Sequence, residues 1–498
     1  MKIAVVCPSP VPFTIGGAEN LAWGLCDAIN KKTEHMCELI KLPLKEHSFW
    51  DLIDSYYAYY NLDLSHFDMV ITTKYPSWMV RHDNSVCYML HTLRGLYDTY
   101  HLCNAPETVP AGFPPVAEII DYMEMHPNYE DLEGFFKLIF KLRQDPRTGC
   151  EKYSHYFNFP GPFIKKIIHY LDRAALTQCG MSGYYSISDT VKNRADYFPP
   201  ACKVTAVYPP TVNERTESKD NKKAKYEHIF VASRLDSAKR IDMLIKAMKY
   251  VTGKVKLYIA GCGPCEEELK ELAKDDSRIK FLGYVSKEEL EKYYSDALVI
   301  PYFPYDEDYG YITVEAMLRK KPVITTKDSG GPNEFVKDNE TGFSVDFDEK
   351  AIAEKIDYLV KNPDEAKRMG ANGYKLVKDI NWESAIEKLI NPKPEPSDQK
   401  KLVVLSTFRI YPPEGGGRSR TFSLYKSLAK RFDVTLVSMD QGDQLRIKRR
   451  IAENMVEYTI PRSVKQSEEE RDLFRKVDRI PVSDIAVLMY PDMTPDFN

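Results

Sequence analysis

Apolar positions in the first 210 residues follow two alternating patterns. The short run Ile3 to Cys7 predicts a buried strand, and a helix-spaced apolar set follows it: Leu21, Leu25, Cys26 and Ile29. Further strands are predicted at Met69 to Thr72, Val86 to Leu90 and Val204 to Tyr208. Strands that alternate with amphipathic helices predict a parallel α/β domain. Residues 97–162 are rich in aromatic residues and prolines and lack this rhythm, which predicts a helical and loop insertion.

A second alternation follows residues Pro209 and Pro210 and predicts another doubly wound domain. Its predicted strands are Ile229 to Ser233, Val255 to Ala260, a strand near Phe281, Leu298 to Ile300 and Val323 to Thr325. Its first predicted helix has Ile241, Leu244, Ile245 and Met248 on one face. A helical segment from Ala351 to Ile390 and a polar, proline-rich linker at residues 391–400 come next.

The start of the chain recurs beyond this linker. A shift of 399 positions places Ile3, Val5 and Val6 on Leu402, Val404 and Leu405, and Gly16-Gly17 on Gly415-Gly416. A chance match is an alternative, since strand-loop-helix units look alike. The recurrence favours a second unit that begins near Lys401 and of which the chain holds only the first part, as in a longer tandem protein.

Composition narrows the class of protein. The chain has 498 residues, which suggests two to four domains, and its net charge of −4 argues against a nucleic-acid partner. Its ten cysteines are scattered, which favours a reducing cytoplasm over a secreted disulfide scaffold. No stretch approaches the roughly 18 apolar residues that a membrane-spanning helix requires. We also find no metal-ligand spacing and expect no cofactor.

Two segments carry the candidate chemistry. EDYGYITVEAM, at residues 307–317, places Glu307 in the loop before a helix and Glu315 in its first turns. Free N–H groups at a helix start suit a diphosphate, and a carboxylate such as Glu315 can accept bonds from ribose hydroxyls. SRLDSAK places Arg234 and Lys239 after another strand of the same domain, so both segments can reach one ligand. Glutamates that only complement a helix dipole and solvated surface cations are the alternatives.

These segments, with AGCGP, FLGYVSKEEL and the GGPNE turn, resemble the retaining nucleotide-sugar glycosyltransferases of the GT-B fold (glycosyltransferase family 4-like). This large family includes sucrose synthase and bacterial polysaccharide and mannosyl transferases, and the resemblance covers Met1 to about Ile390. It implies two Rossmann-like domains facing across a cleft. Residues 1–210 would be the acceptor-side domain, 211–380 the nucleotide-sugar domain, 381–390 a closing helix and 401–498 part of a second acceptor-side domain.

The resemblance also assigns roles. Arg234 and Lys239 would meet the donor diphosphate, Glu315 would bind ribose, and Glu307 would lie near the transferred sugar. The same resemblance extends the donor site to further positions: Gly16, Gly17, Gly263, Val285, Tyr309, Gly310, Tyr311 and Ile312. It makes His91 an active-site histidine, with a structural, hydrogen-bonded histidine as the alternative. Asp308 departs from the family pattern, which usually has Gly there, and leaves the donor-sugar contacts open.

Two motifs point elsewhere. Cys262 and Cys265 spell a redox CxxC, but their surroundings are similar to the glycine-rich loop of the glycosyltransferase carboxyl domain, so we expect an inert role. The helix FIKKIIHYLDR, at residues 163–173, is interpreted as an amphipathic core helix. Its alternative is docking on an anionic membrane, which would suit a lipid-linked acceptor at the inner face of the membrane.

The sequence therefore predicts an enzyme that moves a sugar, with retention, from a nucleoside diphosphate sugar to a hydroxyl of a glycan or lipid-linked acceptor. Surface polysaccharide or glycoconjugate synthesis is the expected process, and no metal is required. Three alternatives remain open: a GT-B sugar-nucleotide epimerase or phosphorolytic enzyme, a catalytically silent sugar-nucleotide-binding module, and a thiol oxidoreductase.

Overall fold

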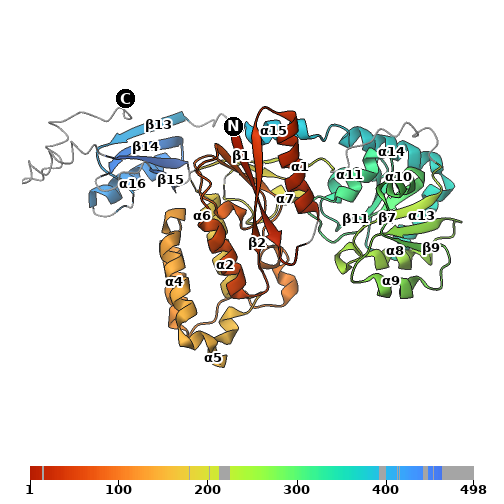
Figure 1. The fold of residues 1–498 in the computed structure, drawn as a ribbon, viewed down its shortest axis with the longest axis horizontal. Coiled ribbons are helices and arrows are strands. Elements are labelled where there is room, and N and C mark those ends of the chain that lie inside the picture. The colour runs from red at the N-terminus through yellow and green to blue at the C-terminus, as the bar shows by residue number, and fades with distance from the viewer. Residues whose placement is uncertain are drawn as a thin grey trace, which may run out of the picture.

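The computed structural model of the chain has three parts, which lie side by side in Figure 1. It describes residues 1–13, 16–178, 180–200, 202–211, 225–391, 400–411, 413, 416–440, 447–452 and 454–461. Most of the predicted linker, Gly415 and residues 462–498 lie outside the described residues. The first two parts are α/β domains with separate sheets, and the third is a smaller α/β unit.

The first domain is built on a six-stranded parallel sheet in the order β2-β1-β3-β4-β5-β6. Its strands are β1 (Lys2–Pro10), β2 (Met36–Leu44), β3 (Met69–Thr72), β4 (Ser85–Met89), β5 (Met181–Ser186) and β6 (Val204–Ala206). Ile3 to Cys7 of β1 are fully buried, because strands flank β1 on both edges and helices cover the sheet. The continuous apolar run of the sequence reflects this central position.

Helices pack around this sheet, and some of them project beyond it at one end. They are α1 (Gly17–Lys32), α2 (Phe49–Tyr60), α3 (Pro114–Met125), α4 (Leu132–Gln144), α5 (Glu151–Ser154), α6 (Pro162–Leu176) and α7 (Asp189–Lys192). Between β4 and β5 the described residues form only helices and loops, and α4 and α5 project to the lower side of Figure 1. Residues 97–162 fall within this region.

The second domain has a parallel sheet in the order β12-β11-β10-β7-β8-β9. Its strands are β7 (His228–Ala232), β8 (Lys256–Ala260), β9 (Ile279–Gly283), β10 (Ala297–Pro301), β11 (Val323–Thr326) and β12 (Gly342–Val345). This is the doubly wound order in which the chain reverses direction between its first and fourth strands, here β7 and β10. Ligands of such sheets bind outside the carboxyl ends of the strands at that reversal.

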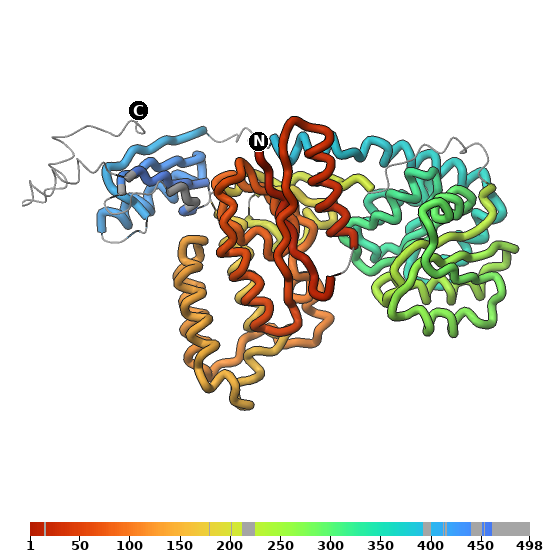
Figure 2. The backbone as a smooth tube through the Cα atoms, in the orientation of Figure 1, coloured from red at the N-terminus to blue at the C-terminus, as the bar shows by residue number. Residues whose placement is uncertain are grey.

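The last helix of the second domain packs against the first domain. The helices of the second domain are α8 (Ile241–Met248), α9 (Glu266–Ala273), α10 (Lys287–Asp296), α11 (Tyr311–Leu318), α12 (Pro332–Phe335), α13 (Glu349–Lys361), α14 (Pro363–Val377) and α15 (Trp382–Ile390). α15 packs on α1, where the ring of Trp382 covers Gly24 and Glu383 pairs with Lys32 at 2.8 Å. Figure 2 shows the chain crossing back to α1 along this route.

The third part is a four-stranded sheet with one helix. Its elements are β13 (Lys400–Ser406), α16 (Gly416–Leu428), β14 (Phe432–Asp440), β15 (Ile447–Ala452) and β16 (Met455–Pro461). The order is β13-β14-β16-β15, with only the β15–β16 pair antiparallel. A hydrogen bond of 2.5 Å from Asn128 Nδ2 to the Tyr411 hydroxyl links this part to the first domain.

The strands that the apolar runs predict in the first two domains are present, and three other strands of these domains were missed: β2, β5 and β12. β2 is an edge strand whose alternating, lysine-containing sequence gives no apolar run, and it is half-buried over most of its length. β5 has the sequence MSGYYS, which contains no aliphatic run. β12 spans only four residues and begins at Gly342. Runs of Val, Ile and Leu mark central strands, and these three lack them.

Candidate active site

Lys239 and Glu307 form an ion pair at the reversal point of the second sheet. The Lys239 ammonium lies 2.6 Å from Glu307 Oε2 and 3.3 Å from the Tyr302 hydroxyl. Lys239 follows β7 and Glu307 follows β10, and these strands are neighbours in the sheet. Both side chains keep some exposure, 21% for Lys239 and 29% for Glu307, so a ligand can reach the pair.

The loop that carries Glu307 leads directly into α11. Gly310 caps this helix with φ +80, a left-handed conformation, and a Cβ there would lie 2.8 Å from Pro332 Cγ. Glycine is therefore required at this turn. Thr313 N donates to the carbonyl oxygen of Gly310 at 2.9 Å, so the N–H groups that can reach a ligand are those of Tyr311 and Ile312. The helix dipole gives this end a partial positive charge, which suits an anion.

Tyr309 and Tyr311 connect this helix start to the first domain. The buried Tyr309 donates a hydrogen bond from its hydroxyl to Pro209 O at 2.9 Å. The ring of Tyr311 lies against Gly17, 3.3 Å from the position that a Cβ would take. The starts of α1 and α11 thus face each other across the two domains. Ile312 follows within α11 and is partly buried.

Glu315 lies on α11 behind the helix start. The Tyr294 hydroxyl donates to Glu315 Oε2 at 3.4 Å, and Arg319 donates to the Glu315 carbonyl oxygen at 2.9 Å. Arg319 also stacks 4.6 Å from the Tyr294 ring and pairs with Glu291. These contacts hold Glu315 in a fixed place on the same helix whose start would receive the diphosphate.

Three predicted donor residues follow the carboxyl ends of adjacent strands. Arg234 follows β7, Gly263 follows β8 and Val285 follows β9. A Cβ at Gly263 would lie 2.3 Å from Leu235 O, so only glycine allows the β7 and β8 loops to approach this closely. The Arg234 side chain is 65% exposed, with a single long contact of 3.8 Å to Asp236, which leaves it accessible to a ligand.

Arg240 is an arginine of this loop that the sequence analysis did not single out. Its guanidinium donates to Phe303 O at 2.6 Å, to Pro304 O at 2.6 Å and to both carboxylate oxygens of Asp328. It fixes the loop after β10 to the loop after β7. In the SRLDSAKR segment, Arg234 is thus accessible to a ligand and Lys239 pairs with Glu307. The guanidinium of Arg240 is already hydrogen-bonded to other residues of the protein.

His91 follows β4 in the first domain and is uncharged. Its Nδ1–H donates to Thr92 O at 2.7 Å, which leaves Nε2 as the acceptor. Burial lowers the pKa of His91 to about 3, and the nearby Lys74, Arg94 and Arg194 charges contribute to the same shift. At neutral pH this histidine can accept a hydrogen bond from a sugar hydroxyl but cannot act as a cation.

Gly16 and Gly17 stand at the start of α1, but they differ in what they offer. The Gly16 amide donates to Glu19 Oε2 at 2.9 Å, so it is occupied within the protein. The Gly16 amide is therefore not available to a donor, whereas the assignment of Gly17 to the donor site stays a prediction. Glu19 itself is buried in the first turn of α1, where a carboxylate complements the helix dipole.

Helix α6 contains the FIKKIIHYLDR segment and belongs to the core. Its apolar face of Ile164, Ile167, Ile168 and Leu171 is fully buried. Lys165 and Lys166 pair with Glu107 at 2.7 Å and Glu124 at 2.9 Å. The face that membrane docking would need is thus packed inside the first domain.

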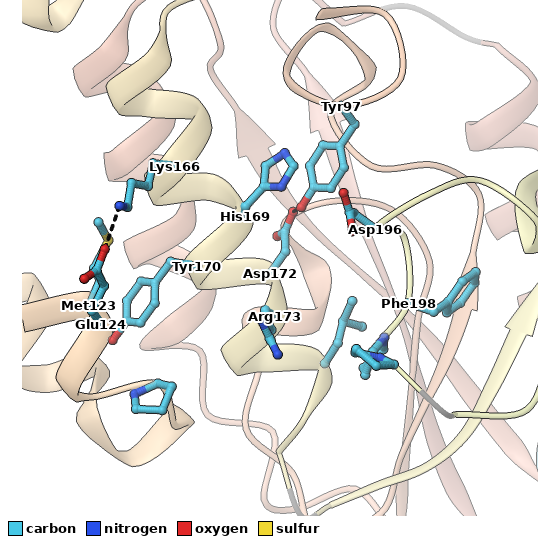
Figure 3. A pocket seen from close by; sticks show the side chains of 14 residues that line it. Tyr97, Met123, Glu124, Lys166, His169, Tyr170, Asp172, Arg173, Asp196 and Phe198 are labelled. Carbon is cyan, nitrogen blue, oxygen red and sulfur yellow. Dashed lines mark hydrogen bonds and ion pairs between the residues drawn. The ribbon is translucent and has the colours of Figure 1, made fainter. Parts of the chain in front are cut away.

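A hollow of about 500 Å³ lies beside α6 (Figure 3). Behind it, the buried Asp172 accepts hydrogen bonds from Tyr56, Trp78 and Tyr97 at 2.7 to 2.9 Å. Burial raises the pKa of Asp172 to about 6 against these three donors. The lining contains none of the predicted donor residues.

The part of the chain that the structure describes contains no group of three or more His, Cys, Asp or Glu side chains able to hold a metal ion. Cys262 and Cys265 are free thiols, the first exposed and the second half-buried. Within the same described residues, no helix is both long and apolar enough to cross a bilayer.

Sequence reasoning missed two arginines that bind the loop around Glu307 from the first domain. Arg94 and Arg194 contact Asp306 and Asp308, the residues on either side of Glu307. Arg94 and Asp306 are 212 positions apart, and no local pattern links them. The one available signal was Asp308, an acidic residue where the resembled family usually has glycine.

Comparison with solved structures defines the class of fold. A sucrose-phosphate synthase from Thermosynechococcus elongatus superposes with a TM-score of 0.52 at 16% identity, covering 78% of this chain and 98% of the other. The lipopolysaccharide outer core galactosyltransferase WaaB superposes with a TM-score of 0.50 at 14% identity, over 79% of this chain and all of that chain. The two Rossmann-like domains thus have the GT-B arrangement.

Comparison of sequences relates the second domain to a family. Residues 212–376 match the family of Glycosyl transferases group 1. The poly(ribitol-phosphate) alpha-N-acetylglucosaminyltransferase of Staphylococcus aureus (strain COL) is 31% identical over 169 residues, which are 32% of this chain and 34% of the relative. A probable sucrose-phosphate synthase of Thermosipho melanesiensis is 29% identical over 224 residues, 42% and 49% of the two chains.

The chain spans between about a third and a half of the length of these curated relatives. The resemblance to GT-B glycosyltransferases is confirmed, since a group 1 glycosyl transferase domain lies within a GT-B fold. The match coincides with the second domain, which contains Lys239, Glu307 and Glu315.

Proposed function

We propose that the protein is a retaining glycosyltransferase that uses a nucleoside diphosphate sugar. The observation that carries the proposal is the Lys239–Glu307 pair, 2.6 Å apart beside the free start of α11. A cation next to a helix start can stabilise the negative charge of a departing diphosphate. A carboxylate beside them can bind the sugar that is transferred.

Each residue then has a defined task. Glu315 binds the ribose hydroxyls, the start of α11 and the exposed Arg234 bind the diphosphate, and Lys239 balances the charge that grows on the leaving phosphate oxygen. The acceptor hydroxyl attacks the anomeric carbon from the face that the diphosphate leaves. Its proton passes to the departing phosphate oxygen, so the sugar keeps its configuration and the protein forms no covalent bond.

The acceptor we propose is a hydroxyl of a glycan or of a lipid-linked glycan in surface polysaccharide or glycoconjugate synthesis. The names of the relatives support this class: one modifies poly(ribitol-phosphate), and another, a Staphylococcus aureus protein, 32% identical over 174 residues, serves capsular polysaccharide biosynthesis. Neutral His91, on the first-domain side, is suited to accept a hydrogen bond from a sugar hydroxyl. The reaction needs no metal in this scheme, and we place it in the cytoplasm.

A panel of nucleoside diphosphate sugars tests the proposal. Binding is first screened by thermal shift, because a ligand at 100 times its dissociation constant adds about 2.7 kcal/mol of stability. Diphosphate release and the anomeric configuration of the product are then measured with simple sugar acceptors. We expect release that depends on the acceptor and a product of unchanged configuration.

Two controls make the result specific. Lys239→Ala should abolish most turnover, whereas Lys246→Ala removes a lysine paired with Asp242 on the surface of α8 and should not. Turnover of a bound donor to an isomeric nucleotide sugar, without transfer, would instead establish an epimerase. Binding without any turnover would establish a silent binding module.

A further inference from the structure

The loop that carries Glu307 is bound on both sides by arginines of the first domain. Arg94 NH2 donates a hydrogen bond to Asp306 Oδ2 at 2.7 Å. Arg194 NH2 lies 2.9 Å from Asp308 Oδ1, a contact between opposite charges in which Asp308 Oδ1 accepts no hydrogen bond. Arg194 also donates to the Asp306 carbonyl oxygen at 2.9 Å. Glu307 therefore sits between two residues that the other domain holds.

Both arginines are fixed within their own domain by Asp98. Arg94 NH2 lies 2.7 Å from Asp98 Oδ2, and Arg194 NH1 donates to the same carboxylate. The Tyr197 hydroxyl donates to Asp98 Oδ1 at 2.6 Å. Only 6% of the Arg194 side chain is exposed, so its guanidinium cannot swing out to solvent.

The loop is equally constrained within the second domain. Glu307 N donates to Ser329 O at 2.9 Å, and Gly331 N donates to Glu307 O at 2.8 Å. The Glu307 carboxylate meets Lys239 at 2.6 Å. A shift of Asp306 or Asp308 toward or away from the arginines must therefore move the Lys239–Glu307 pair as well.

Three carboxylates share the two guanidinium groups, which leaves one negative charge in excess. Burial raises the pKa of Asp308 to about 7, although Arg194 and Arg94 lower it, and Glu307 and Asp98 add to the rise. Burial also raises the pKa of Asp306, against both arginines. The Asp98 pKa is lowered, because the hydrogen bonds and charges of Tyr197, Arg94 and Arg194 outweigh its burial.

We propose that Arg94 and Arg194 are positioning residues that latch Asp306 and Asp308 and so set Glu307 and Lys239 against the first domain for the transfer step. This inference rests on the proposed glycosyltransferase function. The Asp308 part of the latch depends on a carboxylate, because a glycine at this position could make no such contact.

A second set of contacts between the domains lies nearby and does not involve the side chains of Asp306 and Asp308. Asp189 N and Thr190 N donate to the two Glu334 oxygens at 3.0 and 2.6 Å, and the Tyr208 hydroxyl donates to Glu334 at 2.8 Å. These bonds can keep the domains associated when Asp308 is changed. Loss of the latch should then alter the site without separating the domains.

The decisive experiment compares Asp308→Asn, Arg194→Gln and the double variant. Each single change should lower kcat at least about tenfold, since small misplacements of catalytic groups cost up to 100-fold. Affinity for free nucleoside diphosphate, measured by calorimetry, should stay within about twofold, because Glu315 and the start of α11 are untouched. The double variant should be no slower than the slower single variant.

Asp276→Asn is the matched control. Asp276 and Arg278 form an equally short pair, 2.7 Å, within the second domain before β9, and this change should leave kcat unaltered. Additive effects of the two latch substitutions, or full kcat in both, would overturn the proposal. A kcat loss accompanied by an equal loss of nucleotide affinity would overturn it as well.

Thermal unfolding of the wild type, the two single latch variants and the double variant separates this inference from the proposed function. Coupling between Arg194 and Asp308 should appear as a double-variant Tm well above that expected from adding the two single shifts, whatever reaction the protein catalyses. If coupling is present but the protein turns over no nucleotide sugar, the proposed function is wrong and the contact between Arg194 and Asp308 is confirmed. If coupling is absent while the wild-type protein transfers sugar, the latch proposal is wrong and the proposed function is unaffected.

The pH dependence gives a further readout. With the domains latched, Asp308 binds a proton up to pH about 7, whereas an exposed aspartate binds one only up to about 4. The contribution of Asp308 to the free energy of unfolding is thus largest below pH about 4. It falls as the pH rises to about 7, because burial of the charged carboxylate opposes its attraction to Arg194 and Arg94, and it stays constant above. Asp308→Asn should flatten the Tm profile across this interval, and an unchanged slope would contradict the assignment.

Discussion

The first and third parts of the molecule begin with the same local structure but bury it differently. β1–α1–β2 and β13–α16–β14 are both parallel strand-helix-strand units, and their helices begin 399 positions apart, at Gly17 and Gly416. In β1 the residues Ile3 to Cys7 are fully buried. In β13, Val403 is 62% and Leu405 is 59% exposed.

The difference comes from what packs against each unit. β1 has a parallel neighbour on both edges, and α15 covers α1. Among the described strands β13 pairs only with β14, and α16 has no buried residue among its described side chains. A short-range pattern thus predicts the local elements, whereas burial depends on partners that come from elsewhere in the chain.

The two units also differ in the chemistry that faces them. The start of α1 meets the start of α11, with Tyr311 against Gly17 and the Lys239–Glu307 pair beyond. The described residues of the third part face no such domain. We therefore expect the first two domains to contain all of the catalytic groups, and each prediction below tests one side of this contrast.

The largest effect should come from Lys239→Ala. Its ammonium is needed most when the diphosphate departs, and losing one such group typically costs about 3 kcal/mol, or around a hundredfold in kcat. Steady-state kinetics with the best donor of the panel would measure this. A kcat within threefold of wild type would make Lys239 an ordinary partner of Glu307 with no part in the reaction.

Glu315→Ala should weaken nucleotide binding itself. Charge-assisted hydrogen bonds contribute about 1.5 to 3 kcal/mol, and the ribose is held before and after the chemical step. Calorimetry with the free nucleoside diphosphate should show a dissociation constant roughly 10 to 100 times higher. Glu288→Ala, which removes an exposed carboxylate from the neighbouring helix α10, serves as the control and should leave nucleotide affinity unchanged.

The strand-burial contrast can be measured with one substitution in each unit. Val6→Ala and Leu405→Ala occupy equivalent positions under the 399-residue shift, but only Val6 is fully buried. We expect Val6→Ala to lower the free energy of unfolding by about 2 kcal/mol and Leu405→Ala by less than about 0.5 kcal/mol. Equal losses in chemical denaturation would show that β13 is covered in solution.

The sequence predicted the central strands and the donor-side loops because both are encoded locally. Val70 to Thr72 is a continuous buried run, and Glu307 and Glu315 share one eleven-residue segment. The Arg94–Asp306 contact and the three bonds to Asp172 could not be predicted, since they join residues that are 75 or more positions apart. A lone aspartate in an amphipathic helix gives no sign that tyrosines and a tryptophan surround it.

The smallest effect should follow removal of residues 392–498. A hydrogen bond from the Asn128 side chain to the Tyr411 hydroxyl joins the third part to the first domain. The third part contains no counterpart of SRLDSAK or of the glutamate segment. We therefore expect the third part to take no part in catalysis by the first two domains. Donor hydrolysis and single-sugar transfer by residues 1–391 should then stay within about threefold of the full chain.

The deletion has two distinguishable outcomes. α15 ends at Ile390, so the truncated chain keeps the helix that packs on α1 and should retain a cooperative thermal transition. A chain that still folds and binds nucleotide, but transfers no sugar, would mean that the third part completes the acceptor site. In that case the exposed face of β13 would belong to the functional enzyme, and the tandem interpretation would be abandoned.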